Sequence, residues 1–479
     1  MHRGLYLVPL ALGGCAQLFG IDNTTGPADS GNSLTLSVQH VSVGASPVKA
    51  PQDLTGQTAE FLVGDANGLV PTAATIAGPG TWTADLPTGN PPALFTLPDL
   101  PMGHHYWALP SRAMRGNLVV FEHPNATAPS ATSQIALNVT LPAAYNSETL
   151  IVYAVGAWMN HVLAGAEVPA VSATTAAATI PYSSFNPASG AIVPSRITAA
   201  DIVLVLEYAG ADLTGVLQAA QFDQTDGTDN VAGTMVAVAH DKMLNIPLTA
   251  TATRFTAVRP AVGAPGTSWG LSAAPGASVG TAFGPQLLSG TPAATDTAVT
   301  AMYGNPFESL GWPAIFGLTS SGTRTYMLGA LPVTLSAFVA SYVDASATTA
   351  AFDAGLPTTI NLNTTQLTTD GQTITVDTSK PIEITFSPDQ VTNTLYTVHL
   401  DELAPNAMAT AVDRTTIFAG TSTDHTFDVP SDLLTSGHTY VIRAGCIRGG
   451  FSQAASGDLQ TFAFPVSFGQ LDSGVFTVQ

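Results

Sequence analysis

The sequence predicts an all-β protein, organised as tandem β-sandwich domains along a chain of 479 residues. Apolar and polar residues alternate with period two in many short segments, and this alternation is typical of half-buried strands. Charged residues make up only 10% of the chain, whereas Gly and Pro number 44 and 34, which favours short strands joined by turns. Apolar residues reach 45%, so the chain can build packed cores.

Residues 1–15 have the pattern of a secretory signal. Arg3 precedes a short apolar run, and two glycines lead directly to Cys15. The apolar run is too short to span a bilayer as a helix, which needs about 20 residues. The segment Leu12-Gly13-Gly14-Cys15 resembles the lipobox of bacterial lipoproteins. This resemblance implies that the chain is cut before Cys15 and that membrane lipid is attached to its thiol; the alternative is an ordinary Cys in a plain signal or a buried segment.

The stretch after this motif, residues 16–32, is polar and rich in Gly, Asn, Asp and Thr. Such a composition predicts a flexible tether that lets an anchored domain stand away from a membrane. Residue 16 is Ala rather than Asp. By resemblance to lipoprotein sorting in Gram-negative bacteria, this residue favours the outer membrane, with the domains facing the periplasm or the cell surface.

Four β units are expected to follow the tether. Residues 33–125 open with the alternating strand 34–39 and close in a Pro- and Asn-containing stretch, which predicts a first sandwich. Residues 130–262 contain the alternating segment 135–141 and two apolar runs, at 150–155 and 202–208, whose length suits strands buried on both faces, although periodicity alone does not exclude a buried helix.

Residues 267–360 are rich in Gly, Ala, Ser and Pro and show the weakest strand pattern, so they are assigned as a third β unit from short segments such as 333–335. Residues 363–479 show the clearest one, with strands at 382–386, 395–400 and 438–444. This order of strands resembles a fibronectin type III-like or other Ig-like sandwich. The family's usual early Trp is missing, because no Trp follows Trp312.

Charge and cysteine content restrict the function. The net charge of −20 argues against nucleic-acid partners, whose phosphates require a Lys and Arg footprint. The chain contains two cysteines, and if Cys15 carries lipid, then Cys446 has no partner for a disulfide. We expect Cys446 to be a buried, unreactive thiol that contributes to packing. No pattern in the sequence indicates a cofactor.

An acidic loop between 222 and 230 offers oxygen ligands. Asp223, Asp226 and Asp229, followed by Asn230, are the residue types that bind calcium in flexible loops. The spacing does not match an EF-hand, and the closing Glu is absent. The alternative is a solvated turn, because Asp, Asn and Gly are preferred turn residues.

Aromatic residues cluster in the segment Tyr303–Trp312, which also contains Phe307. Exposed rings on a loop can form a platform for a sugar or for a partner chain. The alternative is that these rings are part of a core, which is the more frequent use of large aromatic side chains.

Two further patterns match catalytic or metal sites only in part. Gly276-Ala277-Ser278-Val279-Gly280 matches the nucleophile elbow of serine hydrolases, but neither the strand before nor the helix after it is present in the sequence pattern. His104 and His105 are adjacent, and adjacent residues of a strand point to opposite faces, so they are unsuited to one metal ion. We therefore expect no catalytic residue and no metal ligand at either pattern.

Together these observations predict a non-enzymatic, membrane-anchored envelope lipoprotein with a role in adhesion, scaffolding or capture of a protein or glycan ligand. A carbohydrate-binding envelope protein and a cell-envelope hydrolase with an unrecognised site are the alternatives. A hydrolase should show convergent ionisable residues in one pocket, and a sugar binder should show coplanar exposed rings, whereas a scaffold should show neither.

Overall fold

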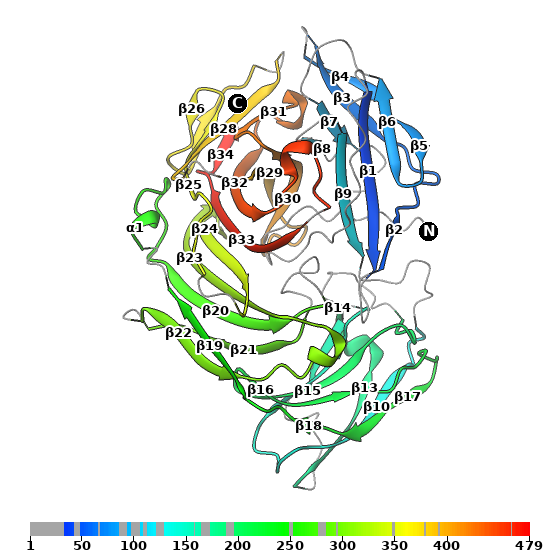
Figure 1. Ribbon diagram of the computed structural model, residues 1–479. Coiled ribbons are helices and arrows are strands. Elements are labelled where there is room, and N and C mark those ends of the chain that lie inside the picture. The colour runs from blue at the N-terminus through cyan, green and yellow to red at the C-terminus, as the bar shows by residue number, and fades with distance from the viewer. Residues whose placement is uncertain are drawn as a thin grey trace.

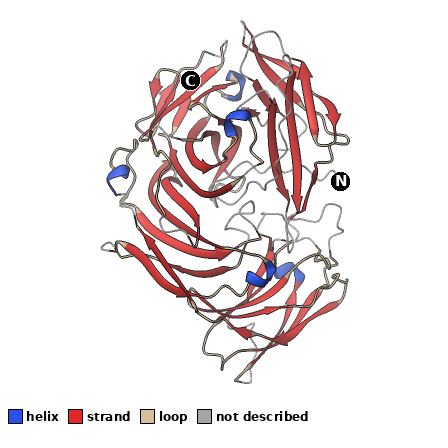
Figure 2. Cartoon of the chain, viewed as in Figure 1, coloured by secondary structure: helices blue, strands red, loops and turns tan. Residues whose placement is uncertain are grey.

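The structure is a computed structural model, and it describes residues 33–42, 48–65, 68–85, 93–96, 106–108, 113–120, 129–157, 159–163, 173–187, 196–248, 252–275, 284–293, 296–346, 350–377, 380–390, 393–460 and 462–479. Strands account for 59% of the described residues and helical turns for 4%, which confirms the all-β prediction. Figure 2 shows how short the helical segments are beside the strands. They are α1 (Ala252–Phe255) and the 3-10 turns Tyr182–Ser184, Glu308–Leu310, Ser431–Leu433 and Ala454–Ser456. No helix among the described residues is long and apolar enough to cross a membrane.

One long sheet, called sheet B here, connects most of the described chain through strand pairing, and it contains 20 strands. The strands are β3 (Glu60–Asp65), β4 (Gly68–Ala73), β7 (Ala93–Thr96), β8 (Tyr106–Ala108), β11 (Thr149–Ala154), β12 (Met159–Leu163), β14 (Asn186–Pro187), β15 (Val203–Ala209), β16 (Asp212–Gln218), β18 (Val236–Ala237), β20 (Gly266–Ala273), β21 (Gln286–Gly290), β23 (Ala314–Leu328), β24 (Leu331–Asp344), β27 (Gln372–Ile374), β29 (Leu395–Pro405), β30 (Val412–Ser422), β32 (Thr439–Gly450), β33 (Ala463–Asp472) and β34 (Phe476–Val478).

Four smaller sheets accompany sheet B. Sheet A contains β1 (Ser33–Ser42), β2 (Val48–Pro51), β5 (Thr75–Gly78), β6 (Thr81–Asp85) and β9 (Ala113–Val120). Sheet C contains β10 (Gln134–Thr140), β13 (Thr175–Pro181) and β17 (Thr228–Thr234). Sheet D contains β19 (Lys242–Pro247) and β22 (Ala298–Tyr303), and sheet E contains β25 (Pro357–Leu362), β26 (Thr365–Gln366), β28 (Ile382–Pro388) and β31 (Thr426–Val429).

The three largest cores lie between the small sheets and sheet B, as expected when each sheet must bury one face. Leu36 and Trp82 of sheet A pack with Phe61 of β3 and Phe95 of β7. The alternation of segment 135–141 is confirmed in β10, where Ile135, Leu137 and Val139 are buried in a core shared with β11 and β15, whereas Asn138 is exposed. Sheets D and E both contribute to the largest core.

The small sheets follow the predicted units more closely than sheet B does. Sheets A and C lie within 33–125 and 130–262, but sheet D pairs β19 with β22 across the predicted gap at 262–267, and sheet E begins at Pro357. Sheet B passes across every predicted boundary, because β8 pairs with β30, β16 with β21 and β24 with β33. The predicted units therefore share one sheet.

The view in Figure 1 makes this sharing visible. The blue N-terminal strands lie beside the orange and red strands β29 to β32, and the cyan and green strands β10 to β18 lie at the opposite end of the body. Strands that are distant in the chain are thus direct neighbours, as in the parallel pair Ala419 and Trp107. The fibronectin III-like subtype of residues 363–479 stays a prediction.

The long hairpin of β23 and β24 is the centre of sheet B. Its two strands pair continuously from Ile315 opposite Asp344 to Leu328 opposite Leu331. The connection is a two-residue turn whose first residue, Gly329, has φ 62°, a conformation that glycine adopts without steric cost. The hairpin joins the green strands of Figure 1 to the red strand β33.

Candidate functional site

Several predicted site residues lie outside the described residues. These are the lipid-attachment residue Cys15 with the tether 16–32, the pair His104 and His105, and the elbow-like segment 276–280 with Ser278. They stay predictions.

The aromatic segment Tyr303–Trp312 is part of the core. The exposed fractions of Tyr303, Phe307 and Trp312 are only 7%, 2% and 1%, and the last two rings lie 5.6 Å apart between centroids. Asn305 holds this arrangement, because its side-chain amide donates to the carbonyl of Trp312 at 2.9 Å and its oxygen accepts from the backbone N–H of Phe307 at 3.1 Å. The hypothesis of an exposed platform for sugar rings is therefore wrong for this segment. Large aromatic rings gain more free energy from burial in a core than other side chains do, and these three rings are buried.

Each aspartate of the acidic loop accepts hydrogen bonds from groups of the protein. Asp223 accepts from the backbone of Ala199 at 2.8 Å, and Asp226 accepts from Arg196 at 2.6 Å. Asp229 accepts from both the backbone and the hydroxyl of Thr225, four residues before it. Within the described residues, no three His, Cys, Asp or Glu side chains gather as a metal site would require. These contacts match the turn interpretation of the loop, and the calcium hypothesis gains no support from them.

A groove of about 520 Å³ lies where the chain passes from sheet C to sheet B. It is lined by the following residues of β16, the end of β17, the β18 segment and the aromatic loop: Val216, Leu217, Gln218, Thr234, Val236, Ala237, Val238, Ala239, Asp241, Lys242, Asn305, Pro306, Phe307 and Glu308. The acidic loop ends in the first residues of β17, where Asp229 lies, whereas Thr234 at the other end of this strand lines the groove; five residues at a rise of about 3.3 Å place Asp229 about 16 Å from Thr234. The two loops singled out in the sequence therefore do not form a joint site.

The groove is lined by apolar side chains together with polar and charged ones. Its charged residues are Asp241, Lys242 and Glu308, and Lys242 Nζ lies 2.5 Å from Glu308 Oε1. The hydrogen bond to Glu308 raises the pKa of Lys242. Val236, which also lines the groove, is 66% exposed, an unusual exposure for a β-branched apolar residue.

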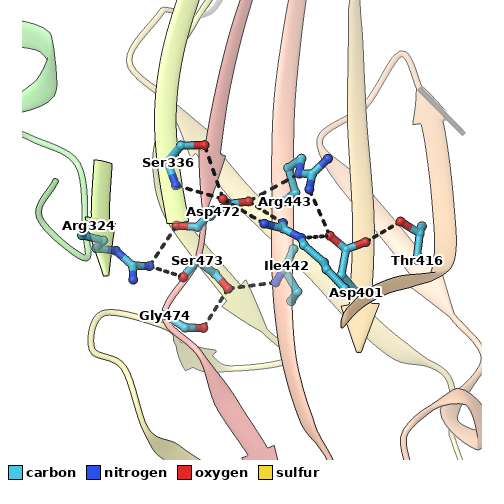
Figure 3. A network of polar contacts seen from close by, with 10 residues as sticks. Arg324, Ser336, Asp401, Thr416, Ile442, Arg443, Asp472, Ser473 and Gly474 are labelled. Atoms are coloured by element: carbon cyan, nitrogen blue, oxygen red, sulfur yellow. Dashed lines mark hydrogen bonds and ion pairs between the residues drawn. The ribbon is translucent and has the colours of Figure 1, made fainter. Parts of the chain in front are cut away.

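A second polar feature lies on the neighbouring strands β23, β24, β33, β32, β29 and β30, and it is drawn in Figure 3. Asp401 and Asp472 form its centre, with side chains 0% and 2% exposed. Arg414 donates to Asp401 at 2.5 Å and to Asp472 at 2.7 Å, and Arg443 reaches the same two carboxylates at 3.3 and 3.4 Å. We call these four residues the Arg–Asp cluster.

Further donors complete the hydrogen bonding of the two carboxylates. The hydroxyl of Thr416 donates to Asp401 at 2.6 Å, and the backbone N–H of Ser336 donates to Asp472 at 2.9 Å (Figure 3). Arg324 extends the network by an ion pair with Asp370 at 2.8 Å. Three arginines of a chain that has only 13 Lys and Arg residues are thus used on strands of sheet B. Buried charges require such pairing, so loss of one partner would leave an uncompensated charge at the centre of sheet B.

The electrostatics of the cluster agree with its geometry. Burial alone would raise the pKa of Asp472, but the charge and the hydrogen bonds of Arg414 outweigh burial and lower it. His399, directly opposite Arg443 in the sheet, is 2% exposed, and burial lowers its pKa to about 4, although the charge of Asp401 acts in the other direction. His399 is therefore neutral at pH 7.

Sequence reasoning missed this network, because its members are spread over about 150 residues and pair only through the sheet. Single strands nevertheless contained a pattern that indicates buried ion pairs, namely a charged residue in or next to an apolar run. Asp401 follows the apolar run of β29, and Arg443 lies inside the apolar run Tyr440–Ala444 of β32. A charge inside a strand that is buried on both faces requires a partner on a neighbouring strand.

The prediction that Cys446 is buried is confirmed, because this residue is 1% exposed. It is a free cysteine. Burial raises the pKa of its thiol, which keeps the reactive thiolate scarce.

We expect a thiol reagent to label Cys446 only after denaturation, because the native thiol is both buried and protonated. Cys446→Ala should lower the free energy of unfolding by about 1 kcal/mol, as other small truncations in a core do. Titration of the native and the urea-denatured protein measures the difference. Rapid stoichiometric labelling of Cys446 in the native protein would contradict a buried role.

A comparison of the chain with protein-family models and with curated proteins finds no match. The function is therefore argued from the fold, the groove and the sequence motifs.

Proposed function

We propose that this protein is a non-enzymatic bacterial envelope lipoprotein, anchored in the outer membrane through lipid on Cys15, and that its β body captures a ligand in the groove. The anchor rests on the lipobox-like segment ending at Cys15. The tether 16–32 would carry the body away from the membrane, toward the periplasm or the cell surface.

The observation that carries the ligand-capture role is the groove itself. Its volume of about 520 Å³ is in the range of known ligand pockets, and apolar side chains line it together with polar and charged ones. The body that presents it is suited to a fixed binding geometry, because successive strand pairs of sheet B connect β16 to the Arg–Asp cluster, with the single pair Asp212 and Leu288 as the link from β16 to β21. A binding site on a sheet is more rigid than one on free loops.

The ionisable groups of the groove favour binding over catalysis. Lys242 and Glu308 bond to each other, which leaves Asp241 as the remaining charged side chain of the lining. General acid–base catalysis near neutral pH favours groups whose pKa is shifted toward 7, whereas the hydrogen bond to Glu308 raises the pKa of Lys242. The carbohydrate alternative loses its expected platform, because the rings of the aromatic segment are buried.

Replacing Cys15 should separate the anchor from the body. Wild-type protein expressed in a Gram-negative host should carry a radioactive fatty acid and sediment with the outer membrane, whereas Cys15→Ser should be unlabelled and either unprocessed or soluble. Diacylglycerol on Cys15 supplies two acyl chains. Because more than one chain gives stable anchoring, the wild type should not be released from the membrane.

The matched control is Cys446→Ala, which removes the other cysteine and should keep both the label and the sedimentation. A wild-type chain without label, or a Cys15→Ser chain that retains it, would contradict the anchoring proposal.

A further inference from the structure

We infer that the ligand captured by the groove is an extended peptide with a basic side chain, and that it binds by adding a strand to the free edge of β18. This inference deepens the proposed ligand-capture role and rests on it. Strand addition is a general mode of peptide recognition, in which backbone hydrogen bonds supply affinity and flanking side chains supply specificity.

The first argument is the direction of the backbone groups in β18. Val238 donates its backbone N–H to the carbonyl of Thr214 at 2.9 Å, so these two residues form a hydrogen-bonded pair. Pairs alternate along an antiparallel ladder, so the next pair, Gly215 and Ala237, is a non-hydrogen-bonded one. The N–H and C=O of Ala237 therefore point away from β16. Among the strand pairs of the described chain, β18 has β16 as its only partner.

The second argument is the shape of the space beside this edge. Val236 to Ala239 form one wall of the groove, and Asn305 to Glu308 form another. The walls approach each other at Gly304, where an added Cβ would lie 2.2 Å from the carbonyl oxygen of Ala239. Only glycine permits this approach, and Ala237 on the unpaired edge lines the same groove. An extended segment fits such a space, with its backbone toward Ala237.

The third argument is charge. Asp241 and Glu308 line the groove against the single cation Lys242, so the lining carries a net charge of −1. The whole chain carries −20, which repels acidic ligands and attracts basic ones. An apolar side chain of the peptide can cover Val236, which is 66% exposed, while a lysine or arginine next to it reaches the carboxylates. The occupant is thus an alternating apolar and basic segment.

The test uses two acetylated, amidated and fluorescently labelled pentapeptides, Thr-Val-Lys-Val-Thr and Thr-Val-Glu-Val-Thr, with the detergent-solubilised full chain. Fluorescence anisotropy should show binding of the lysine peptide and binding about tenfold weaker, or none, for the glutamate peptide. Ala237→Pro removes the N–H donor at an edge position where proline is tolerated, and it should weaken binding of the lysine peptide about tenfold.

The matched control is Ala237→Val, which keeps the N–H and should bind within about twofold of the wild type. Circular dichroism and the urea midpoint verify that both variants fold. If Ala237→Pro does not fold, the double variant Asp241→Asn with Glu308→Gln replaces it, and this variant should bind both peptides equally.

Equal binding of the two peptides to the wild type, or unchanged binding to folded Ala237→Pro, would overturn the inference. Absence of binding by both peptides would overturn it as well. These outcomes are independent of the fatty-acid label on Cys15, so failure of the peptide inference and failure of the anchoring proposal are distinguishable.

Discussion

Asp472→Ala should lower the free energy of unfolding by about 3–5 kcal/mol, the usual cost of removing one partner from a buried ion pair. The side chain of Asp472 is 2% exposed and bonds to Arg414 and Arg443, which would keep their charges in a largely buried position without this carboxylate. Asp401 alone would then compensate two guanidinium groups. The loss would fall at the centre of sheet B, where β24, β33 and β32 pair.

Urea unfolding followed by circular dichroism measures this effect. Asp377→Ala is the control, because Asp377 and Lys380 form an ion pair 3.9 Å long with side chains 62% and 76% exposed. Exposed pairs contribute little, so the urea midpoint of this variant should stay at the wild-type value. A midpoint of Asp472→Ala equal to that of Asp377→Ala would show that the Arg–Asp cluster does not stabilise the sheet.

Stability should fall by about 3 kcal/mol as pH decreases from 6.5 to 4, because of His399. Its pKa in the folded protein is lowered from 6.5 to about 4 by burial. Between these two values the unfolded chain binds a proton that the folded chain does not, so the free energy of unfolding decreases as pH falls. Each pKa unit corresponds to about 1.4 kcal/mol. The contribution is fully present above pH 6.5.

The surroundings of His399 determine the width of this pH window. The carboxylates of Asp401 and Asp472 favour the protonated ring, whereas the guanidinium groups of Arg443 and Arg414 and the burial of the ring oppose it. Ionised Asp472 also contributes to the free energy of unfolding. This contribution is lost only at lower pH, because the pKa of Asp472 in the folded protein is lowered from its ordinary value of 3.8.

Urea midpoints at pH 7, 6, 5 and 4.5 test this expectation. His399→Gln removes the titrating group and should flatten the profile in this range, even if its stability at pH 7 is lower. His425→Gln is the control, because His425 is 48% exposed and its replacement should leave the slope unchanged. Identical slopes for wild type and His399→Gln would contradict the assignment.

Alternation within single strands was the most reliable signal in the sequence. Segments 34–39, 135–141 and 382–386 are strands, because their period-two pattern matches a sheet with one buried face. The region 267–360 showed the weakest pattern, yet it contains the hairpin of β23 and β24 with 15 and 14 residues. Small residues such as Ser320 and Ala337 are buried there, so the buried face does not stand out by hydropathy.

Long-range pairing was beyond what local patterns specify. Sheet B joins β8 to β30 across about 310 residues, and nothing in either strand alone identifies its partner. The same limit applies to the groove, which forms where β16, β18 and the loop at Asn305 meet. For the aromatic segment, the residue types were recognised, but burial was decided by packing in the largest core, which includes Phe307 and Trp312.

The mass of the N-terminal peptide of the mature protein tests the central claim, an anchored envelope lipoprotein, most directly. Protein purified from the membrane fraction of a Gram-negative host should yield a peptide that begins at Cys15 and carries diacylglycerol on its sulfur. An unmodified Cys15, or an intact peptide that continues from Gly14 through Cys15 to Ala16, would contradict the anchor and with it the proposed place of the groove in the cell envelope.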